Sequence, residues 1–442
     1  MRQFIHTTFI FLLLQSIAAL GAEQTQPALA EALTSEIKQL GADDFDAREK
    51  AQQAILELAR DREGEVLALL KAEVKKSAAP ELLARLEKLQ RLLEVAGKQD
   101  WSVVAGQIYQ LPSVSGGRVF VGNKDRTLYC LDALSGKENW KFNVDGFMYK
   151  SLAVADGRVF LIRTRKDGRP DGTLIALDSH DGRELWRWQD GVKSQYFTAP
   201  IVTGGALYFA RENNLVRLNA MSGELDWMFD AEDSILSPPS VSGGKVLLGT
   251  LENGLLCVDA ANGKPVWHAA LGGACYSGGV VLNERVYAGG GNTLFCLDLK
   301  DGAIKWAYRG NEALTSAPAV KDKQVFAAFG MVFRCIDVSN GRALWDKDTG
   351  GHIFAAPSIV GQRVYVGALN DKLTLYCFDA QSGDELWTHE TKEGGYAEPV
   401  LAGRRIFIGY HSRFYTLKSS MPGPLEWPMT GGNAARTGCN DR

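Results

Sequence analysis

The spacing of hydrophobic and polar residues changes once along the chain, near Lys98. Before this point apolar residues recur at helical spacing, and the chain from Ala28 to about Gly97 is predicted to be helical. The clearest helical segments are residues 43–59, 65–74 and 80–95. After Lys98 the pattern becomes alternating and the segments short, as in GHIFAAPSIV, QRVYVGA, LTLYCFDA and DELWTHE, which predict four strands. The pattern therefore predicts a helical module followed by β-sheets.

A frame of an acid, three residues, a glycine, three residues and a tryptophan repeats through the β part. Its tryptophans are Trp140, Trp186, Trp227, Trp267, Trp306, Trp345, Trp387 and Trp427. A glycine stands four residues before each tryptophan, and an Asp or Asn stands four residues before each glycine except in the last copy, which has Ser419. A second marker, usually a proline, also recurs once in each copy. Both markers indicate eight units of about 40 residues.

The frame is typical of a hairpin followed by an aromatic wedge. The Asp or Asn accepts backbone N–H groups in the turn, and the glycine supplies a positive φ. A four-stranded sheet cannot bury both of its faces alone, so radial copies with a large aromatic between neighbours form a β-propeller. We predict an all-β eight-bladed β-propeller over residues 99–438, preceded by a small α-helical module over 23–98 and followed by a tail over 439–442. A solenoid is the alternative, but the cap-like ends favour a ring.

Two segments compete for the last strand of this ring. GKQDW (97–101) carries the G-x3-W frame before the first unit, and PGPLEW (422–427) carries it in the eighth. We expect the C-terminal segment to complete the last sheet, with the residues around Trp101 alongside or leading into the inner strand of the first blade.

Residues 1–22, MRQFIHTTFIFLLLQSIAALGA, combine an early arginine, a short apolar run and small residues near the end. This combination is typical of a cleavable secretory signal, and it predicts a periplasmic or secreted protein without a membrane span after cleavage. A retained membrane anchor is the alternative. No cysteine precedes Cys130, so we do not expect a lipoprotein.

The net charge argues against two classes of partner, and the positions of the cysteines argue against disulfides. The formal net charge is −3, which argues against nucleic acid and anionic membrane as partners. Five of the seven cysteines, Cys130, Cys257, Cys296, Cys335 and Cys377, stand two residues before the acid of the repeat, where Ala176 stands in the second unit. We expect them to be small buried residues that are too far apart for disulfides. Cys275 and Cys439 fall outside this pattern.

Catalytic patterns are missing from the sequence. The six histidines lack metal-ligand spacing, no CxxC pair occurs, and no nucleophile has a base beside it. The glycine-rich stretch GGACYSGG (272–279) predicts close backbone approach. We therefore predict neither catalytic residues nor a metal site.

Two groups of residues are candidates for binding. A long loop in the second unit gathers Arg163, Arg165, Lys166 and Arg169, and Lys150 in the same unit would add to an acidic-ligand or acidic-peptide site. A solvated hairpin extension is the alternative.

Aromatic residues recur three positions before the proline marker: Tyr109, Tyr149, Phe197, Tyr276, Phe354 and Tyr396. They suit either packing between blades or a ring at the channel mouth for a flat ligand or a peptide. The next position is mostly small and polar, as expected around an axial channel.

The frame, the inner-strand sequences AAPSIV, SAPAV and TAPIV, and the terminal WPMTGGNAARTG (427–438) resemble the pyrroloquinoline-quinone (PQQ) repeat propellers. That family holds quinoprotein dehydrogenases and BamB-like assembly proteins, and the resemblance covers residues 99–438. Unlike the dehydrogenases, this chain has no adjacent cysteines and no long insertions for a calcium site. Unlike BamB, it lacks a lipid-bearing cysteine and has an additional helical segment. These helices resemble HEAT-like repeats, and a helical spacer is the alternative. The resemblance implies an exported, non-catalytic scaffold that binds a protein, a peptide or another ligand without a cofactor, with a BamB-like role in envelope assembly. The alternative is an oxidoreductase that uses PQQ with calcium.

Overall fold

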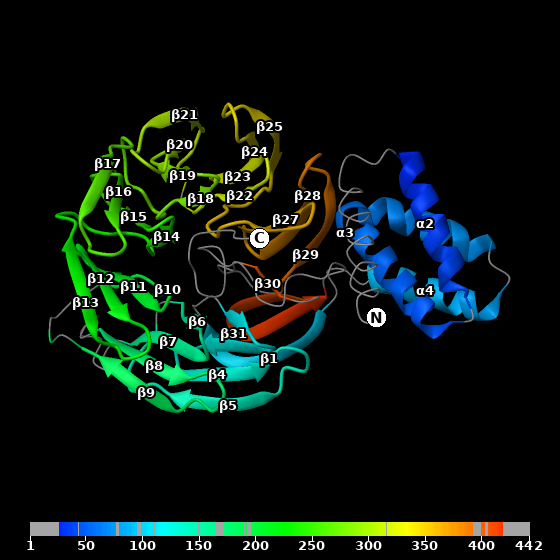
Figure 1. The fold of residues 1–442 in the computed structure, drawn as a ribbon, viewed down its shortest axis with the longest axis horizontal. Helices are drawn as coiled ribbons and strands as arrows, with labels where there is room; N and C mark the ends of the chain where they lie inside the picture. Colours follow the sequence, from blue (N-terminus) through cyan, green and yellow to red (C-terminus); the bar gives the residue numbers. More distant parts are fainter. Residues whose placement is uncertain are drawn as a thin grey trace, which may run out of the picture. The chain divides into compact units, whose positions relative to one another are not determined.

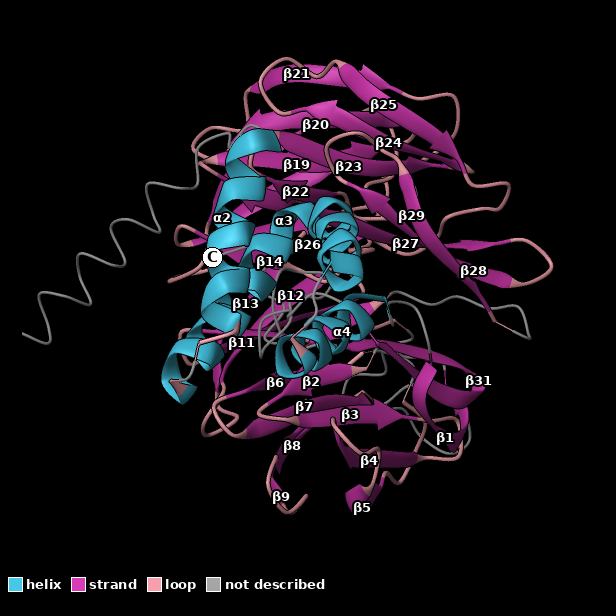
Figure 2. Ribbon diagram, turned by 90° about the vertical axis from the view of Figure 1, so that its right-hand side faces the viewer, coloured by secondary structure: helices cyan, strands magenta, loops and turns pink. Residues whose placement is uncertain are grey.

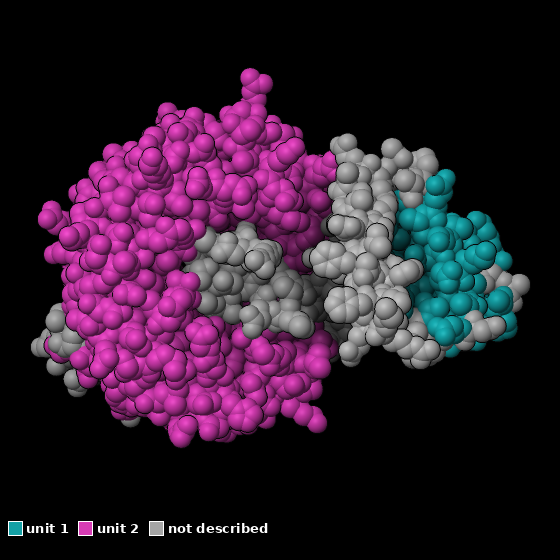
Figure 3. Space-filling view, in the orientation of Figure 1, with its two compact units in different colours: residues 1–95 teal, residues 96–442 magenta. Residues whose placement is uncertain are grey.

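The computed structural model describes residues 26–42, 44–76, 79–94, 99–108, 112–148, 151–163, 172–189, 191, 196–314, 316–391, 399–402 and 405–418. The chain divides into two compact units, Met1–Val95 and Ala96–Arg442, which are coloured separately in Figure 3. The expected signal segment, residues 1–22, lies outside the described residues.

The first unit is helical, as predicted (Figure 2). It contains α2 (Gln26–Leu40), α3 (Phe45–Lys76) and α4 (Pro80–Glu94), which bury a common core that includes Leu33, Ile55 and Leu86. The expectation of separate helices over 43–59 and 65–74 is wrong, because α3 runs through both. A single internal glycine costs a helix only about 1 kcal/mol, which burial of several apolar side chains outweighs. No helix in the described ranges is long and apolar enough to cross a membrane.

The second unit is an all-β propeller of eight sheets, as predicted, with the first strand of each blade next to the axis (Figure 1). Blades 1–4 consist of β2 (Ser113–Ser115), β3 (Arg118–Gly122), β4 (Thr127–Asp132), β5 (Glu138–Asn143); β6 (Ala153–Ala155), β7 (Arg158–Arg163), β8 (Thr173–Asp178), β9 (Glu184–Trp188); β10 (Ile201–Thr203), β11 (Ala206–Arg211), β12 (Asn214–Asn219), β13 (Leu225–Asp230); and β14 (Ser240–Ser242), β15 (Lys245–Gly249), β16 (Leu255–Asp259), β17 (Pro265–Ala269). Blades 5–7 consist of β18 (Val280–Leu282), β19 (Arg285–Gly290), β20 (Thr293–Asp298), β21 (Ile304–Arg309); β22 (Ala319–Lys321), β23 (Gln324–Phe329), β24 (Val332–Asp337), β25 (Ala343–Asp348); and β26 (Ser358–Val360), β27 (Arg363–Leu369), β28 (Leu373–Asp379), β29 (Glu385–Glu390). In these seven blades neighbouring strands follow the chain order.

Blade 8 joins the two ends of the propeller. It contains β30 (Val400–Ala402), β31 (Arg405–Lys418) and β1 (Gln99–Ile108). The first part of β31 pairs with β30, and its second part pairs with β1, with Trp101 opposite Thr416. Our expectation that the C-terminal segment closes the ring is therefore wrong, because β1 occupies the outer position. Both segments carry the same G-x3-W frame and one sheet edge accepts one strand, so the spacing could not choose between them; Trp427 lies outside the described residues.

Five blades have a cysteine two residues before the repeat's acid, and we call this position the cysteine slot. A small residue there lets aromatic rings of the two neighbouring strands meet. In blade 6, Phe326 pairs with Cys335, which pairs with Trp345 on the outer strand. Because the thiol is small, the rings of Phe326 and Trp345 lie 5.8 Å apart above it. The same contact recurs at 5.9–6.2 Å in Phe120–Trp140, Phe160–Trp186, Tyr208–Trp227, Tyr287–Trp306, Tyr365–Trp387 and Phe407–Trp101.

The described cysteines are buried, which confirms the expectation of small buried residues for the five that belong to the repeat. They are Cys130, Cys257, Cys275, Cys296, Cys335 and Cys377, and Cys439 lies outside the described residues. Burial raises the thiol pKa to about 11 for Cys130 and to about 12 for Cys335, so these groups stay protonated at neutral pH.

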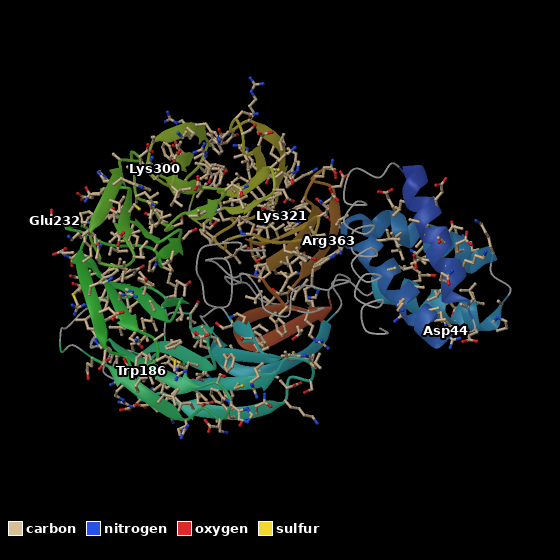
Figure 4. The ribbon with its side chains drawn as sticks, viewed as in Figure 1. Asp44, Trp186, Glu232, Lys300, Lys321 and Arg363 are labelled. Carbon is tan, nitrogen blue, oxygen red and sulfur yellow. The ribbon has the colours of Figure 1, made fainter. Side chains whose placement is uncertain are left out.

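Six tryptophans of the repeat also join their blade to the next one by a hydrogen bond. Trp345 lies over Gly383 of blade 7, where a β-carbon would stand 2.7 Å from the indole and where φ is +76°. Its Nε1–H donates to the Ala380 carbonyl oxygen at 3.0 Å. Equivalent hydrogen bonds of 2.8–3.3 Å join Trp140 to Ser179, Trp186 to Ala220, Trp227 to Ala260, Trp267 to Leu299 and Trp306 to Val338. Trp186 is labelled in Figure 4 on the outer part of its sheet.

The turn that presents this acceptor is held by the repeat's acid. In blade 7 the Asp379 carboxylate accepts the backbone N–H groups of Gln381 and Ser382, both at 2.9 Å. These bonds confirm the role that the sequence assigns to the acid, and the positive φ of Gly383 confirms the role of the glycine.

Trp345→Ala should lower the free energy of unfolding by roughly 3–5 kcal/mol, because it empties the wedge and removes the indole hydrogen bond to the Ala380 carbonyl oxygen, which still accepts from Gln324 Nε2 at 2.8 Å. Trp345→Phe keeps part of the ring and should cost less. Denaturant unfolding of both variants tests this. A change in melting temperature of under a degree for Trp345→Ala would contradict a buried wedge.

Alkaline pH should destabilise the protein through the buried thiols. Their folded pKa values of about 11–12 exceed the value of about 8.5 expected in the unfolded chain, so their contribution is complete below pH 8.5 and declines as the pH rises towards 11–12. The denaturation midpoint should fall over this range, and Cys335→Ala should fall less steeply. Native protein should react slowly with a thiol reagent at pH 7. Rapid reaction of several thiols per chain would show that the slots are accessible.

Candidate functional site

One end of the propeller carries the longer loops, and we call it the loop face. It consists of the loops that lead from an outer strand to the next inner strand and of the hairpins between the second and third strands. Three loops are fastened to the following blade by isolated β-bridges: Phe197 with Arg211, Ile235 with Thr250, and His352 with Leu369. The loop face is therefore held in place by backbone pairing, which limits the entropy lost when it binds a partner.

The predicted aromatic residues do not share one environment. Phe197 is 4% exposed and packs on Gly172, where a β-carbon would lie 1.6 Å from the ring. Tyr276 and Phe354 are 49% and 43% exposed, and the Phe354 ring stacks on His352 at 5.7 Å. Phe197 is thus a packing residue, whereas the other two present rings to solvent. Tyr109, Tyr149 and Tyr396 lie outside the described residues.

The basic segment of blade 2 is described only at its first residue. Arg163 donates from Nη1 to the carbonyl oxygen of Asp145 at 2.9 Å, so it fastens the loop that follows blade 1. Lys150, Arg165, Lys166 and Arg169 lie outside the described residues.

The small polar position next to the aromatic one holds backbone in two blades. Thr198 and Ser237 are buried, and their hydroxyl oxygens accept the N–H groups of Ala210 at 2.8 Å and Gly249 at 3.1 Å. Ser277 and Ser316 are also buried. Thr198 and Ser237 therefore support the loops from beneath, whereas the Ser277 and Ser316 hydroxyls have no hydrogen-bond partner among the described residues.

The glycine-rich stretch 272–279 brings backbones together, as predicted. A β-carbon on Gly249 would lie 2.3 Å from the Cys275 carbonyl oxygen, and one on Gly278 would lie 2.8 Å from the Pro238 carbonyl oxygen. Cys275 is fully buried, its Sγ–H donates to the Ser277 carbonyl oxygen at 3.0 Å, and burial raises its pKa to about 12. A protonated thiol sealed beneath the loops is unsuited to nucleophilic chemistry.

Blades 3 and 4 carry a cluster of acids that is not among the residues predicted from the sequence. Glu212, Glu232 and Glu252 are exposed at loop positions, and Tyr196 and Leu251 beside them are 37% and 43% exposed. We call these five residues, together with Asp233, the acidic loop patch. Glu232 is labelled in Figure 4, where it points outward from the rim.

Hydrogen bonds join the parts of this patch. Glu212 N–H donates to the Tyr196 carbonyl at 3.0 Å, and the Tyr196 hydroxyl donates to the Leu236 carbonyl at 2.9 Å. Leu251 N–H donates to the Ser234 carbonyl at 3.0 Å. Four separate segments between residues 196 and 252 are therefore joined by hydrogen bonds.

Asp233 is the anchor of the patch. One of its carboxylate oxygens accepts the backbone N–H groups of Glu252 and Asn253, each at 2.8 Å. Partial burial opposes ionisation, but the N–H groups of Asn253 and Glu252 outweigh it and lower the pKa of Asp233. The negative charge at Asp233 thus fixes the hairpin that carries Leu251 and Glu252.

A local signal for this patch exists in the sequence, although its meaning depends on the fold. Glu212 and Glu232 adopt φ values of +53° and +55°, positions where glycine or asparagine is usual. The sequences AEDS (231–234) and LEN (251–253) contain acids without a neighbouring base. Only the propeller brings these short runs together.

The fold and loop face define a β-propeller of the kind that supports binding loops on a rigid ring. The protein family described as "Outer membrane protein assembly factor BamB" matches residues 87–230 and 211–420. These matches span well over half of the chain, which therefore belongs to this PQQ-like, BamB-like family.

Relatives agree with this placement. The outer membrane protein assembly factor BamB of Yersinia pestis is 27% identical over 175 residues, which cover 36% of this chain and 43% of that protein. The chain spans less than half the length of the curated relatives it matches first. The crystal structure of BamB from Moraxella catarrhalis has a TM-score of 0.60 at 14% identity, covering 73% of this chain and 99% of that one. A quinohemoprotein alcohol dehydrogenase from Pseudomonas putida HK5 has a TM-score of 0.61 at 14% identity, covering 74% and 77%. At such identities the solved structures show a shared fold alone.

Asp233→Ala should lower the free energy of unfolding by about 1.5–3 kcal/mol, because two backbone N–H groups lose a charged acceptor. Glu232→Ala, next to it and exposed, should change it by under about 0.5 kcal/mol. Asp233 contributes above its unfolded pKa near 3.9, and the contribution fades as the pH falls through its lower folded pKa. Denaturant titrations at pH 7 and pH 3 measure both effects. Equal stability of the two variants at pH 7 would contradict the anchoring role.

Proposed function

We propose that this protein is an exported, non-catalytic scaffold that binds a protein partner through its loop face and serves in envelope assembly, as the names of its BamB relatives suggest for them. Export and a periplasmic location rest on the signal-like residues 1–22. Family membership supports an assembly role.

The acidic loop patch is the observation that carries the proposal. It places exposed apolar side chains, Tyr196 and Leu251, beside the carboxylates of Glu212, Glu232 and Glu252 on loops held by backbone hydrogen bonds. An aromatic or aliphatic anchor ringed by charges is typical of protein-binding surfaces. A partner segment with lysine or arginine next to an apolar side chain complements it, and its affinity should fall with salt.

The alternative function is a PQQ-dependent oxidoreductase, which the fold shared with quinohemoprotein dehydrogenases favours. Across the part of the chain that the structure describes, no three His, Cys, Asp or Glu side chains are grouped to hold an ion. The chain also has no adjacent cysteines. The described acids, histidines and cysteines therefore do not match a site for PQQ and its calcium ion.

Capture experiments on exported-protein extract test the scaffold function. We expect the tagged full-length chain to retain specific proteins, and the triple variant Glu212→Gln, Glu232→Gln, Glu252→Gln to lose them. A matched variant, Glu224→Gln, Glu284→Gln, Glu385→Gln, removes three exposed charges at the other end of the strands and should retain them. Lys150→Ala, with and without neutralisation of Arg163, Arg165, Lys166 and Arg169, tests the basic segment in the same way.

Equal recovery by the two triple variants would show that the acidic loop patch is not the binding surface. In parallel, PQQ and calcium are added to purified protein, and bound-cofactor absorbance and dye reduction are measured. Stoichiometric cofactor with alcohol-dependent dye reduction would replace the scaffold function with the oxidoreductase.

A further inference from the structure

Blade 8 is assembled differently from the other seven blades. In blades 1–7 a tight hairpin joins the outer strand to its neighbour, and the repeat's acid or asparagine binds that turn, as Asp379 does in blade 7. In blade 8 the outer strand β1 pairs with β31, which lies about 300 residues later in the chain. No covalent turn holds β1 on its sheet, so its attachment depends on side-chain packing and strand hydrogen bonds.

The wedge at this seam has ring packing but lacks its polar contact. Trp101 lies over Gly136, where a β-carbon would stand 2.6 Å from the indole, and its ring lies 5.8 Å from that of Phe414. Its Nε1–H is buried and has no hydrogen-bond partner among the described residues, whereas six other tryptophans donate to the next blade. An unsatisfied buried donor costs free energy, a loss that the seam of Trp387 in blade 7 shares and the six hydrogen-bonded seams avoid.

The residue that pairs with Trp101 is a second buried polar group without a hydrogen-bond partner among the described residues. Thr416 occupies the slot that holds cysteine in five blades and alanine in one, because it pairs with the tryptophan of its sheet. Its side chain is 0% exposed, and its hydroxyl has no partner within the described ranges. Two buried polar groups thus lie unsatisfied at the contact between β1 and β31.

We propose that β1 is a releasable closing strand, so that the ring opens at blade 8 before any other blade loses its outer strand. Local opening follows the weakest contacts of a fold, and here the weakness coincides with the absence of a covalent turn. β1 begins at Gln99, just after the boundary of the helical unit at Val95. A partner that binds the helical unit and favours released β1 would therefore shift ring closure.

Hydrogen exchange on the full-length protein, followed by mass spectrometry, tests this proposal. Amides of β1 should exchange at least tenfold faster than amides of the outer strands β13 and β17, after correction for intrinsic rates. Exchange of β1 at the rate of β13 and β17 would overturn it.

Two matched substitutions separate release from general looseness. Thr416→Val keeps the shape of the side chain and removes the orphan hydroxyl, and it should slow exchange of β1 about tenfold. Thr198→Val removes a buried hydroxyl that accepts the Ala210 N–H, and it should instead speed exchange near residues 196–211 without changing β1. Unchanged β1 exchange in Thr416→Val would overturn the assignment of this contact as the weak point.

Discussion

The seating of a tryptophan of one blade on the glycine of the next is the contact on which the propeller depends. A β-carbon at Gly136, Gly182, Gly223, Gly263, Gly302, Gly341 or Gly383 would lie 2.6–2.8 Å from the neighbouring indole. Two constraints therefore favour glycine at this position: a side chain would clash with the indole, and the backbone adopts a positive φ in the turn. Repetition of this contact sets the spacing between blades, and a constant spacing closes a ring.

The same contact explains residues that seem unrelated to it. In most blades an aromatic side chain of the same sheet supports the indole from behind, usually with a small residue between the two rings, whereas in blade 4 Leu247 takes the place of that aromatic. Cysteine and alanine fill that slot, as Cys335 and Ala176 show, whereas Arg217 in blade 3 is accommodated by an ion pair with Asp226 at 3.0 Å and by stacking over Tyr208. Once the ring is rigid, its loops can vary without loss of the fold, which is why the candidate site lies on them.

Residues at one position of the repeat can have opposite roles in different blades. Phe197 and Tyr276 both stand three residues before the proline marker, yet Phe197 is buried on Gly172 and Tyr276 is half exposed. The difference comes from Gly172, which stands just before β8 of blade 2 and lies against the Phe197 ring. The acidic loop patch shows the converse, since Glu212, Glu232 and Glu252 belong to different segments that only the closed ring brings together.

The sequence by itself determined the number of blades, the hairpin turns and the interblade wedge, because these depend on contacts that recur at a fixed spacing along the chain. It also determined that the five cysteines of the repeat are packing residues, since their position is part of the same repeat. Only the tertiary structure decided which strand closes the ring, because Trp101 and Trp427 carry the same local frame and the choice depends on which segment reaches the free edge of β31. Only the tertiary structure assembled the loop face as well, because a surface formed by separate loops has no pattern along the chain.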